Sequence, residues 1–221
     1  MLACNETGFF VDGEIYLRQR KPNQGQRVVH QLCQRFYRSG RNITFDRFFT
    51  SIPLARSLLE RGQEVLGTVR KNKRELPPLF VASNRPEHFS LFGYNDGVQI
   101  VSSMALPKKC VIMVSIMHSD NGVELDNKEK PHAIRDYNAT KCPVDRIDQM
   151  ANTLTTRRKT RRWPMTIFFN ILGIAAINSY ISWLLLHPTW HENERVHRRS
   201  IFLKELACSL MEPWIRERPD D

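Results

Sequence analysis

The sequence predicts an α/β fold with an inserted β-rich segment and a helical C-terminal part. Three observations predict this class. Residues 1–70 alternate between short strand patterns and helix patterns. Residues 79–117 contain short apolar runs separated by turn signals, and the pattern is helical from about residue 143 to the end. Strands that alternate with helices favour a mixed sheet covered by helices.

The N-terminal residues predict two or three short strands joined by tight turns. The expected strands are Met1–Cys4, Phe9–Val11 and Ile15–Leu17. Residues 25–38 then place apolar side chains at helical spacing, and Ser39–Gly40 ends that helix.

A strand, a helix and another strand follow. Asn42–Phe45 predicts a strand that ends at Asp46. Residues 52–61 have a proline near their start and are followed by Gly62, which predicts a helix. Residues 64–70 predict the next strand, and a basic turn follows it.

The β-rich segment contains four strand-like runs, followed by a polar loop at 118–133. The runs are LFVA at 79–82, FSLFGY at 89–94, GVQIVSSMAL at 97–106 and CVIMVSIM at 110–117. Proline, charged clusters and Asn-Asp-Gly separate them, as is typical of strands joined by turns.

Residues 165–186 form an uncharged stretch that is long enough to cross a bilayer. It also contains Asn170 and Asn178, and amide side chains are costly in a membrane. We therefore expect a buried central helix, with Trp163, Phe168 and Phe169 in the core. A membrane anchor is the alternative.

Composition favours a polyanionic partner. The chain has 33 Lys and Arg against 23 Asp and Glu, a formal charge of +10. Such a charge suits nucleic acid and also an anionic membrane surface. The 5 cysteines are scattered and odd in number, which argues against a disulfide framework and favours a reducing compartment.

Acidic side chains at two places are candidates for chemistry. Asp46 follows a predicted strand, and active sites of open α/β sheets gather at strand ends. Asp145 and Asp148 are spaced i, i+3 on a predicted helix, so that their carboxylates share a face and suit a divalent metal ion. Each place has a structural alternative: a turn or helix cap for Asp46, and complementation of the helix dipole for the other two.

Two basic runs are candidates for phosphate binding. The first is Thr155–Trp163, which contains Arg157, Arg158, Lys159, Arg161 and Arg162 without an acidic residue. The second spans residues 15–45 and contains Arg18, Arg20, Lys21, Arg27, Arg35, Arg38 and Arg41, again without an acidic residue. A solvated helix face is the alternative for such runs.

Four long stretches show a family resemblance: NITFDRFFTSIPLARSLL, GTVRKNKRELP, RDYNATKCPVDRIDQM and TRRKTRRWPMTIFFNILGIAAINSYI. In this order they resemble successive blocks of piggyBac-type transposases and of the host proteins derived from them. The match covers nearly the whole chain. It implies a ribonuclease H-like core with an inserted β-rich subdomain, divided here as 1–74, 75–133 and 134–221.

The resemblance also implies the site. That family uses three aspartates as ligands of Mg²⁺ or Mn²⁺, and Asp46 and Asp145 match the second and third positions, with Asp148 nearby. The first position falls in Ala3–Phe9. Alignment on Thr7 and Gly8 places Cys4 there, and a slip of one residue places Asn5 there. Neither side chain is a carboxylate.

We therefore expect a DNA-binding remnant of a DDE/DDD transposase, located in the nucleus and inactive because the first aspartate is absent. The family's N-terminal dimerisation region and its C-terminal zinc module have no match here, which predicts a catalytic-domain fragment. DNA is the expected partner; a homodimer is left open, and neither a membrane nor a small-molecule substrate is expected. The alternatives are an active metal-dependent transposase, in which Glu6 or a partner supplies the missing ligand, and a protein-interaction module.

Overall fold

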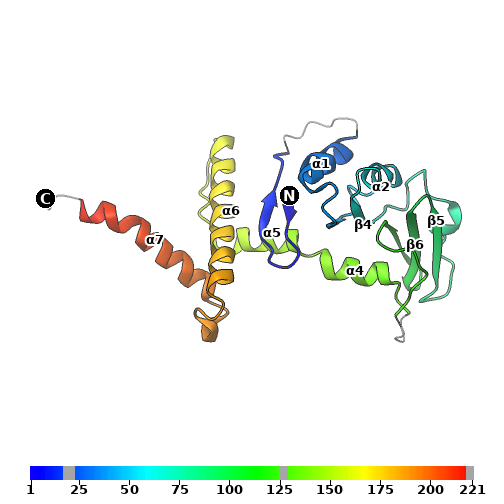
Figure 1. Ribbon diagram of the computed structural model, residues 1–221. Helices are drawn as coiled ribbons and strands as arrows, with labels where there is room; N and C mark the ends of the chain where they lie inside the picture. Colours follow the sequence, from blue (N-terminus) through cyan, green and yellow to red (C-terminus); the bar gives the residue numbers. More distant parts are fainter. Residues whose placement is uncertain (17–22, 125–128, 218–221) are drawn as a thin grey trace. The chain divides into compact units, whose positions relative to one another are not determined.

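The computed structural model describes residues 1–16, 23–124 and 129–217. The chain divides into two compact units (Figure 1). Unit 1 consists of Met1 and Asp12–Cys142, and unit 2 consists of Leu2–Val11 and Pro143–Asp221. The chain thus leaves unit 2 after its first residues and returns to it at Pro143.

Unit 1 is built on a mixed sheet of five strands in the order β3-β4-β7-β6-β5. The strands are β3 (Asn42–Phe45), β4 (Glu64–Thr68), β5 (Ser90–Asn95), β6 (Val98–Leu106) and β7 (Lys109–Ser115). Strands β3 and β4 are parallel, and the other neighbours are antiparallel. The expected β-rich segment therefore continues the sheet that β3 and β4 begin.

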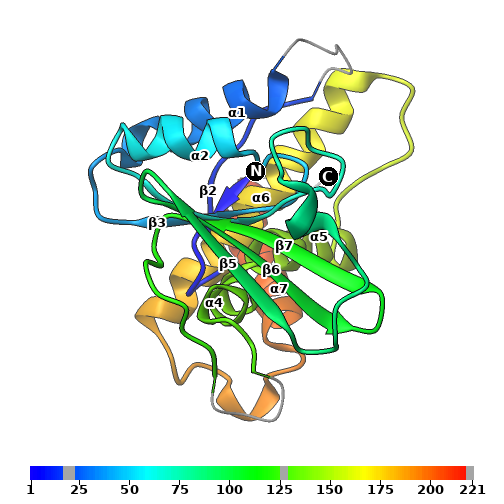
Figure 2. The same ribbon diagram turned by 90° about the vertical axis from the view of Figure 1, so that its right-hand side faces the viewer.

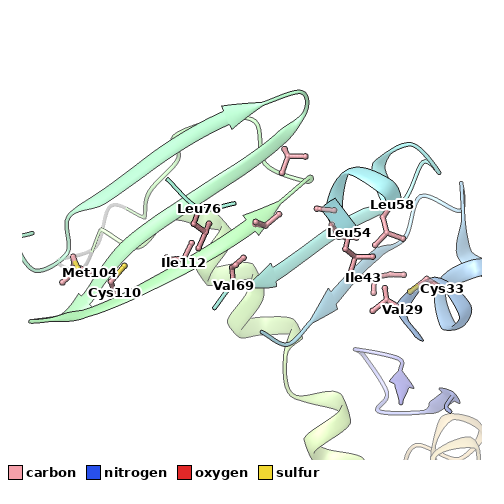
Figure 3. Close-up of a cluster of buried hydrophobic side chains, with 14 residues drawn as sticks. Val29, Cys33, Ile43, Leu54, Leu58, Val69, Leu76, Met104, Cys110 and Ile112 are labelled. Carbon is pink, nitrogen blue, oxygen red and sulfur yellow. The ribbon is translucent and has the colours of Figure 1, made fainter. Parts of the chain in front are cut away.

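Helices cover both faces of this sheet (Figure 2). On one face lie α1 (Gln24–Cys33), its 3-10 extension η1 (Gln34–Phe36), α2 (Ile52–Leu59) and the short α3 (Pro78–Val81). On the other face lies α4 (His132–Thr140), which packs on Leu66, Val101 and Met113. The larger core fills the first face, where Leu54 and Leu58 of α2 meet Ile43 of β3 (Figure 3).

The segment 79–82, expected as a strand, instead forms the end of the helix α3, with Ala82 as its C-cap. Pro77 and Pro78 explain the difference, because proline fixes φ near the helical value and suits the first turn of a helix. The turn places Phe80 directly over Gly93 of β5. A Cβ at Gly93 would lie 2.7 Å from the Phe80 ring, so only glycine permits this contact.

Helix α4 begins eleven residues before the expected helical start at 143 and lies partly in the expected polar loop. Its apolar side chains are few, and Ala133 is its only buried residue. A helix with so short an apolar stripe shows little periodicity in sequence.

Unit 2 contains a small hairpin and a set of helices. The hairpin pairs β1 (Leu2–Ala3) with β2, whose range Phe10–Asp12 ends in unit 1. The helices are α5 (Pro143–Thr153), α6 (Trp163–Leu186), the 3-10 turn η2 (Glu192–Glu194) and α7 (Arg198–Arg216). The expected third strand is absent at Ile15 and Tyr16, which have no regular structure, and Leu17 lies outside the described residues.

Helix α6 is not the buried helix that the sequence predicts. Only Ile177 and Ile181 are buried, although the helix is apolar around its circumference. Its neighbours within unit 2 are α5, α7 and the hairpin, and these cover one side of it. By length and composition alone, α6 is the one helix among the described residues that could span a membrane.

The aromatic residues assigned to the core are exposed in part. Trp163 is 68% exposed and Phe168 is 49% exposed, so both core assignments are wrong. Phe169 is half-buried and contacts Phe168, its neighbour in sequence. These residues lie in the first two turns of α6, away from Ile177 and Ile181.

Candidate functional site

Asp46 lies where the sequence predicts it, directly after β3 in unit 1. Its side chain is exposed, and its Oδ1 accepts a hydrogen bond from the N–H of Arg47 at 2.6 Å. The cap of the next helix is Ser51, whose Oγ accepts a hydrogen bond from Leu54 N–H at 3.3 Å. Asp46 is therefore not a helix cap.

Thr50 stabilises the turn that presents Asp46. The Thr50 side chain is fully buried, and its hydroxyl donates to the backbone carbonyl of Asp46 at 2.9 Å. Gly67 of β4 lies opposite Phe45 in the parallel pair and leaves room for this hydroxyl. Because of these contacts, the backbone at Asp46 is anchored in the core while its carboxylate remains exposed.

A basic turn follows β4 at the same end of the sheet. Since β3 and β4 are parallel, their C-terminal ends lie at one edge, so the residues after Thr68 neighbour those after Phe45. The turn contains four cations, Arg70, Lys71, Lys73 and Arg74. The Arg70 guanidinium lies 5.4 Å from the ring centre of Phe48, which is 58% exposed. The edge beside Asp46 therefore combines positive charge with an exposed aromatic ring.

Cys4 begins the turn of the hairpin in unit 2. Its N–H donates to the Phe9 carbonyl at 2.9 Å, and its carbonyl accepts from Gly8 N–H at 2.9 Å. Hydrogen bonds from the side chain and then the backbone of Thr7 lower the pKa of the Cys4 thiol. Asn5 and Glu6 are exposed in the turn. The strand ends at Ala3, one residue before the expected bound at Cys4, so Cys4 and Glu6 do not share a strand face.

Asp145 and Asp148 lie on α5, as the sequence predicts. Both side chains are exposed, and between them Ile147 is buried against Ala3, Phe9 and Phe10 of the hairpin. The elements that bear Cys4 and the two aspartates are therefore packed together within unit 2 (Figure 1). Asp145 also lies in the first helical turn, where an acidic residue complements the dipole.

Within either unit, no three His, Cys, Asp or Glu side chains among the described residues are grouped closely enough to hold a metal ion. Asp46 belongs to unit 1, whereas Asp145 and Asp148 belong to unit 2.

The basic run at Thr155–Trp163 connects α5 to α6 without helical structure up to Arg162, so it is not a solvated helix face. Its five cations are exposed, and none lies within 4 Å of a carboxylate among the residues that the structure describes. Arg157 donates to the amide oxygens of Asn152 and Asn170. The run therefore remains available to an anionic partner.

The run at 15–45 is partly neutralised. Arg27 pairs with Glu14, and Arg35 pairs with Asp12 at 2.9 Å. These two acids precede the run in sequence, so a count within its bounds misses them. Arg38 and Arg41 are exposed, while Arg18, Arg20 and Lys21 lie outside the described residues.

The sequence patterns did not reveal the role of three features of these sites. The basic turn after β4 becomes informative only once β3 and β4 are paired in parallel. Thr50 and Gly67 act through a contact between a turn and a strand. Asn178 of α6 bonds to the hairpin from 168 residues away, and its only sequence signal is a polar residue in an apolar helix.

Comparison with known proteins agrees with this arrangement. A family model described as Transposase IS4 matches residues 1–180. A solved structure, the cryo-EM structure of piggyBac transposase in a synaptic complex with hairpin DNA, matches with a TM-score of 0.84 at 35% sequence identity. The match covers 98% of this chain and 47% of that one, so the chain spans about half the length of that relative. The chain thus belongs to the Transposase IS4 family, with the ribonuclease H-like α/β fold of piggyBac transposase.

Proposed function

We propose that this chain is a DNA-binding transposase domain that does not cut DNA, because its set of catalytic carboxylates is incomplete. The observation behind the proposal is the side chain at the first family position. Alignment on Thr7 and Gly8 of the family motif places Cys4, not Asn5, at that position. We assign Asp46 and Asp145 to the second and third positions on the match of their motifs, with Asp148 as the nearby fourth carboxylate.

The DNA-binding half of the proposal is supported by free positive charge. The segment 155–163 offers five exposed cations without carboxylate partners among the described residues, and the turn after β4 adds the exposed Arg70, Lys71 and Arg74 and the half-buried Lys73. Clustered Lys and Arg neutralise successive phosphates and release the bound counterions, which is the main source of sequence-independent affinity for DNA. The similar piggyBac transposase is itself described in a complex with DNA.

The inactive half is supported by the chemistry of the ligands. DDE transposases generally use a divalent metal ion, and a two-metal site relies on carboxylate oxygens to hold both ions. A thiol is a soft ligand that suits Mg²⁺ poorly, because Mg²⁺ prefers hard oxygen donors. Asp46, Asp145 and Asp148 are exposed carboxylates. With Cys4 at the first position, the residues present do not fit the metal site of an active transposase.

The test is a Mn²⁺-dependent nicking assay on a duplex with a piggyBac-type transposon end. DNA binding is measured first in the same samples by fluorescence anisotropy. We expect the unaltered chain to bind the duplex and leave it intact, and Cys4→Asp to nick it. Asn5→Asp is the matched control, since it adds the same carboxylate one residue away, and it should stay inert.

Two results would contradict the proposal. Nicking by the unaltered chain that Asp46→Ala abolishes would show an active site that tolerates Cys4. Failure of the unaltered chain to bind the duplex at low salt would remove the DNA-binding half.

A further inference from the structure

Asn178 is a polar residue within α6, the most apolar of the helices that the structure describes, and both the oxygen and the nitrogen of its amide form hydrogen bonds. Its Oδ1 accepts a hydrogen bond from Phe10 N–H at 2.9 Å. Its Nδ2 donates to the Phe10 carbonyl, also at 2.9 Å. An amide side chain in apolar surroundings is costly unless such bonds satisfy it, and here one backbone residue satisfies both groups.

This pair of bonds has the form of a strand pairing. In an antiparallel ladder, two residues face each other and exchange both N–H···O=C bonds. The Asn178 side chain makes the same exchange with Phe10, on the edge of β2 that faces away from β1. The next residue back, Phe9, uses its carbonyl on the opposite edge, where it accepts from Cys4 N–H at 2.9 Å. The two edges of the strand are therefore assigned without ambiguity.

The register of the hairpin is fixed because each edge of β2 has its own hydrogen-bond partner. Successive residues of a strand direct their backbone groups to opposite edges, so a slip of one residue would turn the groups of Phe9 or Val11 toward Asn178. The groups of Phe9 are already used by the turn, and Phe9, Phe10 and Ala3 pack on Ile147 of α5. While Phe10 is held, Cys4 remains the residue at the start of the turn.

We propose that Asn178 is a positioning residue, which holds the hairpin in register against α5 and so determines that Cys4, not Asn5, occupies the first site position. This inference rests on the proposed function in one respect: the proposed function identifies the position of Cys4 as the first position of the metal site. The bond itself is independent of DNA and of metal.

Neighbouring polar residues of α6 do not have this role. The Ser179 hydroxyl donates to the Ala175 carbonyl one turn back in the same helix, at 2.9 Å. The Asn170 amide oxygen accepts from Arg157 in the preceding segment. Only Asn178, among the polar side chains described in α6, bonds to the hairpin. Ser179 therefore provides a matched control one residue away.

Amide hydrogen exchange measured by NMR is the direct test. We expect Asn178→Ala to speed exchange of the Phe10 amide by about tenfold or more, since two hydrogen bonds are lost. Exchange of the Cys4 and Gly8 amides should rise with it, while amides of β6 and β7 in unit 1 stay as protected as before. Ser179→Ala should leave the Phe10 amide unchanged.

A second variant, Asn178→Asp, distinguishes an effect on the register of the hairpin from a general loss of folding. It keeps the acceptor for Phe10 N–H and loses the donor to the Phe10 carbonyl, so protection of Phe10 should fall between those of the unaltered chain and Asn178→Ala. An unchanged Phe10 or Cys4 amide in Asn178→Ala would overturn the inference. The inference would also be overturned if Asn178→Asp remained folded and its Phe10 amide exchanged as fast as in Asn178→Ala.

A second readout links the bond to the site. In a Cys4→Asp background, Mn²⁺ binding followed by electron paramagnetic resonance should weaken about tenfold when Asn178→Ala is added. Equal Mn²⁺ binding with and without Asn178→Ala would overturn the positioning role. If Cys4→Asp alone does not bind Mn²⁺, that result counts against the proposed function, whereas the exchange experiment still decides the role of Asn178.

Discussion

Gly67 shows how a single residue supports the candidate site. A Cβ there would lie 2.5 Å from Thr50 Oγ1 and 2.9 Å from the Phe45 carbonyl oxygen. Both groups belong to the strand and turn that present Asp46, and Thr50 is fully buried. The missing side chain at Gly67 is therefore a requirement of the turn.

We expect Gly67→Ala to lower the free energy of unfolding by about 1–3 kcal/mol, because overpacked groups in a buried site must move. Urea unfolding followed by circular dichroism measures this. Gly173→Ala in α6 is the matched control, since no atom outside its own helix lies within 4 Å of the added Cβ. Alanine also favours the helix, so this variant should be as stable as the unaltered chain or more so. Equal stabilities of Gly67→Ala and the unaltered chain would contradict the expected clash.

The location of a site residue could be predicted only where local sequence signals define the strand or helix that bears it. Asp46, Asp145 and Asp148 lie on the elements expected for them, because each element has strong local signals. The paired state of Arg27 and Arg35 could not be predicted, since it depends on the tertiary contacts that these side chains make with Glu14 and Asp12.

At the scale of elements, β3 and α2 match the expected bounds closely. Helix α2 has the cap Ser51 before it, Pro53 in its first turn and Gly62 after it, so local residues encode both of its ends. Two of the wrong predictions concern α3 and α6. In α3 the prolines outweighed an apolar run, and in α6 apolar character did not produce burial, because burial depends on how many neighbours surround a helix.

Helix α4 is anchored to the rest of unit 1 by a series of polar contacts that begins at its middle. Asp136 accepts a hydrogen bond from Arg135 Nε at 2.7 Å and lies 3.1 Å from Nε2 of His118. Ser115 Oγ lies 2.7 Å from the other ring nitrogen of His118, at the end of β7. Thr140 and Thr44 are also joined, 2.7 Å apart, so α4 is bonded to the strand that precedes Asp46.

These contacts predict a pH-dependent contribution to stability. Burial raises the pKa of Asp136, but the hydrogen bonds and charges of Arg135 and His118 outweigh it, so that the pKa lies below the usual 3.8. A carboxyl group with a lowered pKa stabilises the fold above the pKa of the unfolded state, and this contribution is lost as the pH falls through the folded pKa. Asp136→Asn should therefore cost about 1–3 kcal/mol at pH 7 and less at pH 3.

Urea unfolding at the two pH values tests this expectation. Asp96→Asn is the control, because its side chain is 82% exposed and lies 3.6 Å from Arg56. An exposed ion pair of this kind contributes little, so the control should change stability by less than about 1 kcal/mol. A cost for Asp136→Asn that is the same at pH 3 as at pH 7 would show that the contact does not depend on the charge of the carboxylate.

At the scale of the whole molecule, the chain has a formal charge of +10, but its cations are not equally free to contact DNA phosphates. Arg27 and Arg35 are used in ion pairs in unit 1, while the cations of 155–163 in unit 2 have no carboxylate partner among the described residues. An equal number of arginines removed from the two places should therefore affect DNA binding differently. Net charge alone predicts equal effects, and the structure predicts unequal ones.

The measurement is the dependence of the DNA association constant on salt, by fluorescence anisotropy with a duplex of unrelated sequence. Each phosphate contact contributes about 0.9 to the slope of log K against log salt, so replacing Arg157, Arg158, Arg161 and Arg162 by alanine should flatten the slope by up to about 3.6. Removing only Arg161 and Arg162 should flatten it by up to about 1.8, whereas the pair Arg27→Ala and Arg35→Ala, with the same change in net charge, should leave it nearly unchanged. If both double variants flatten the slope equally, binding follows net charge and the 155–163 segment is not a phosphate-binding surface. If only the 161–162 pair does so, the segment contacts the DNA backbone, and the ion pairs in unit 1 keep their arginines from it.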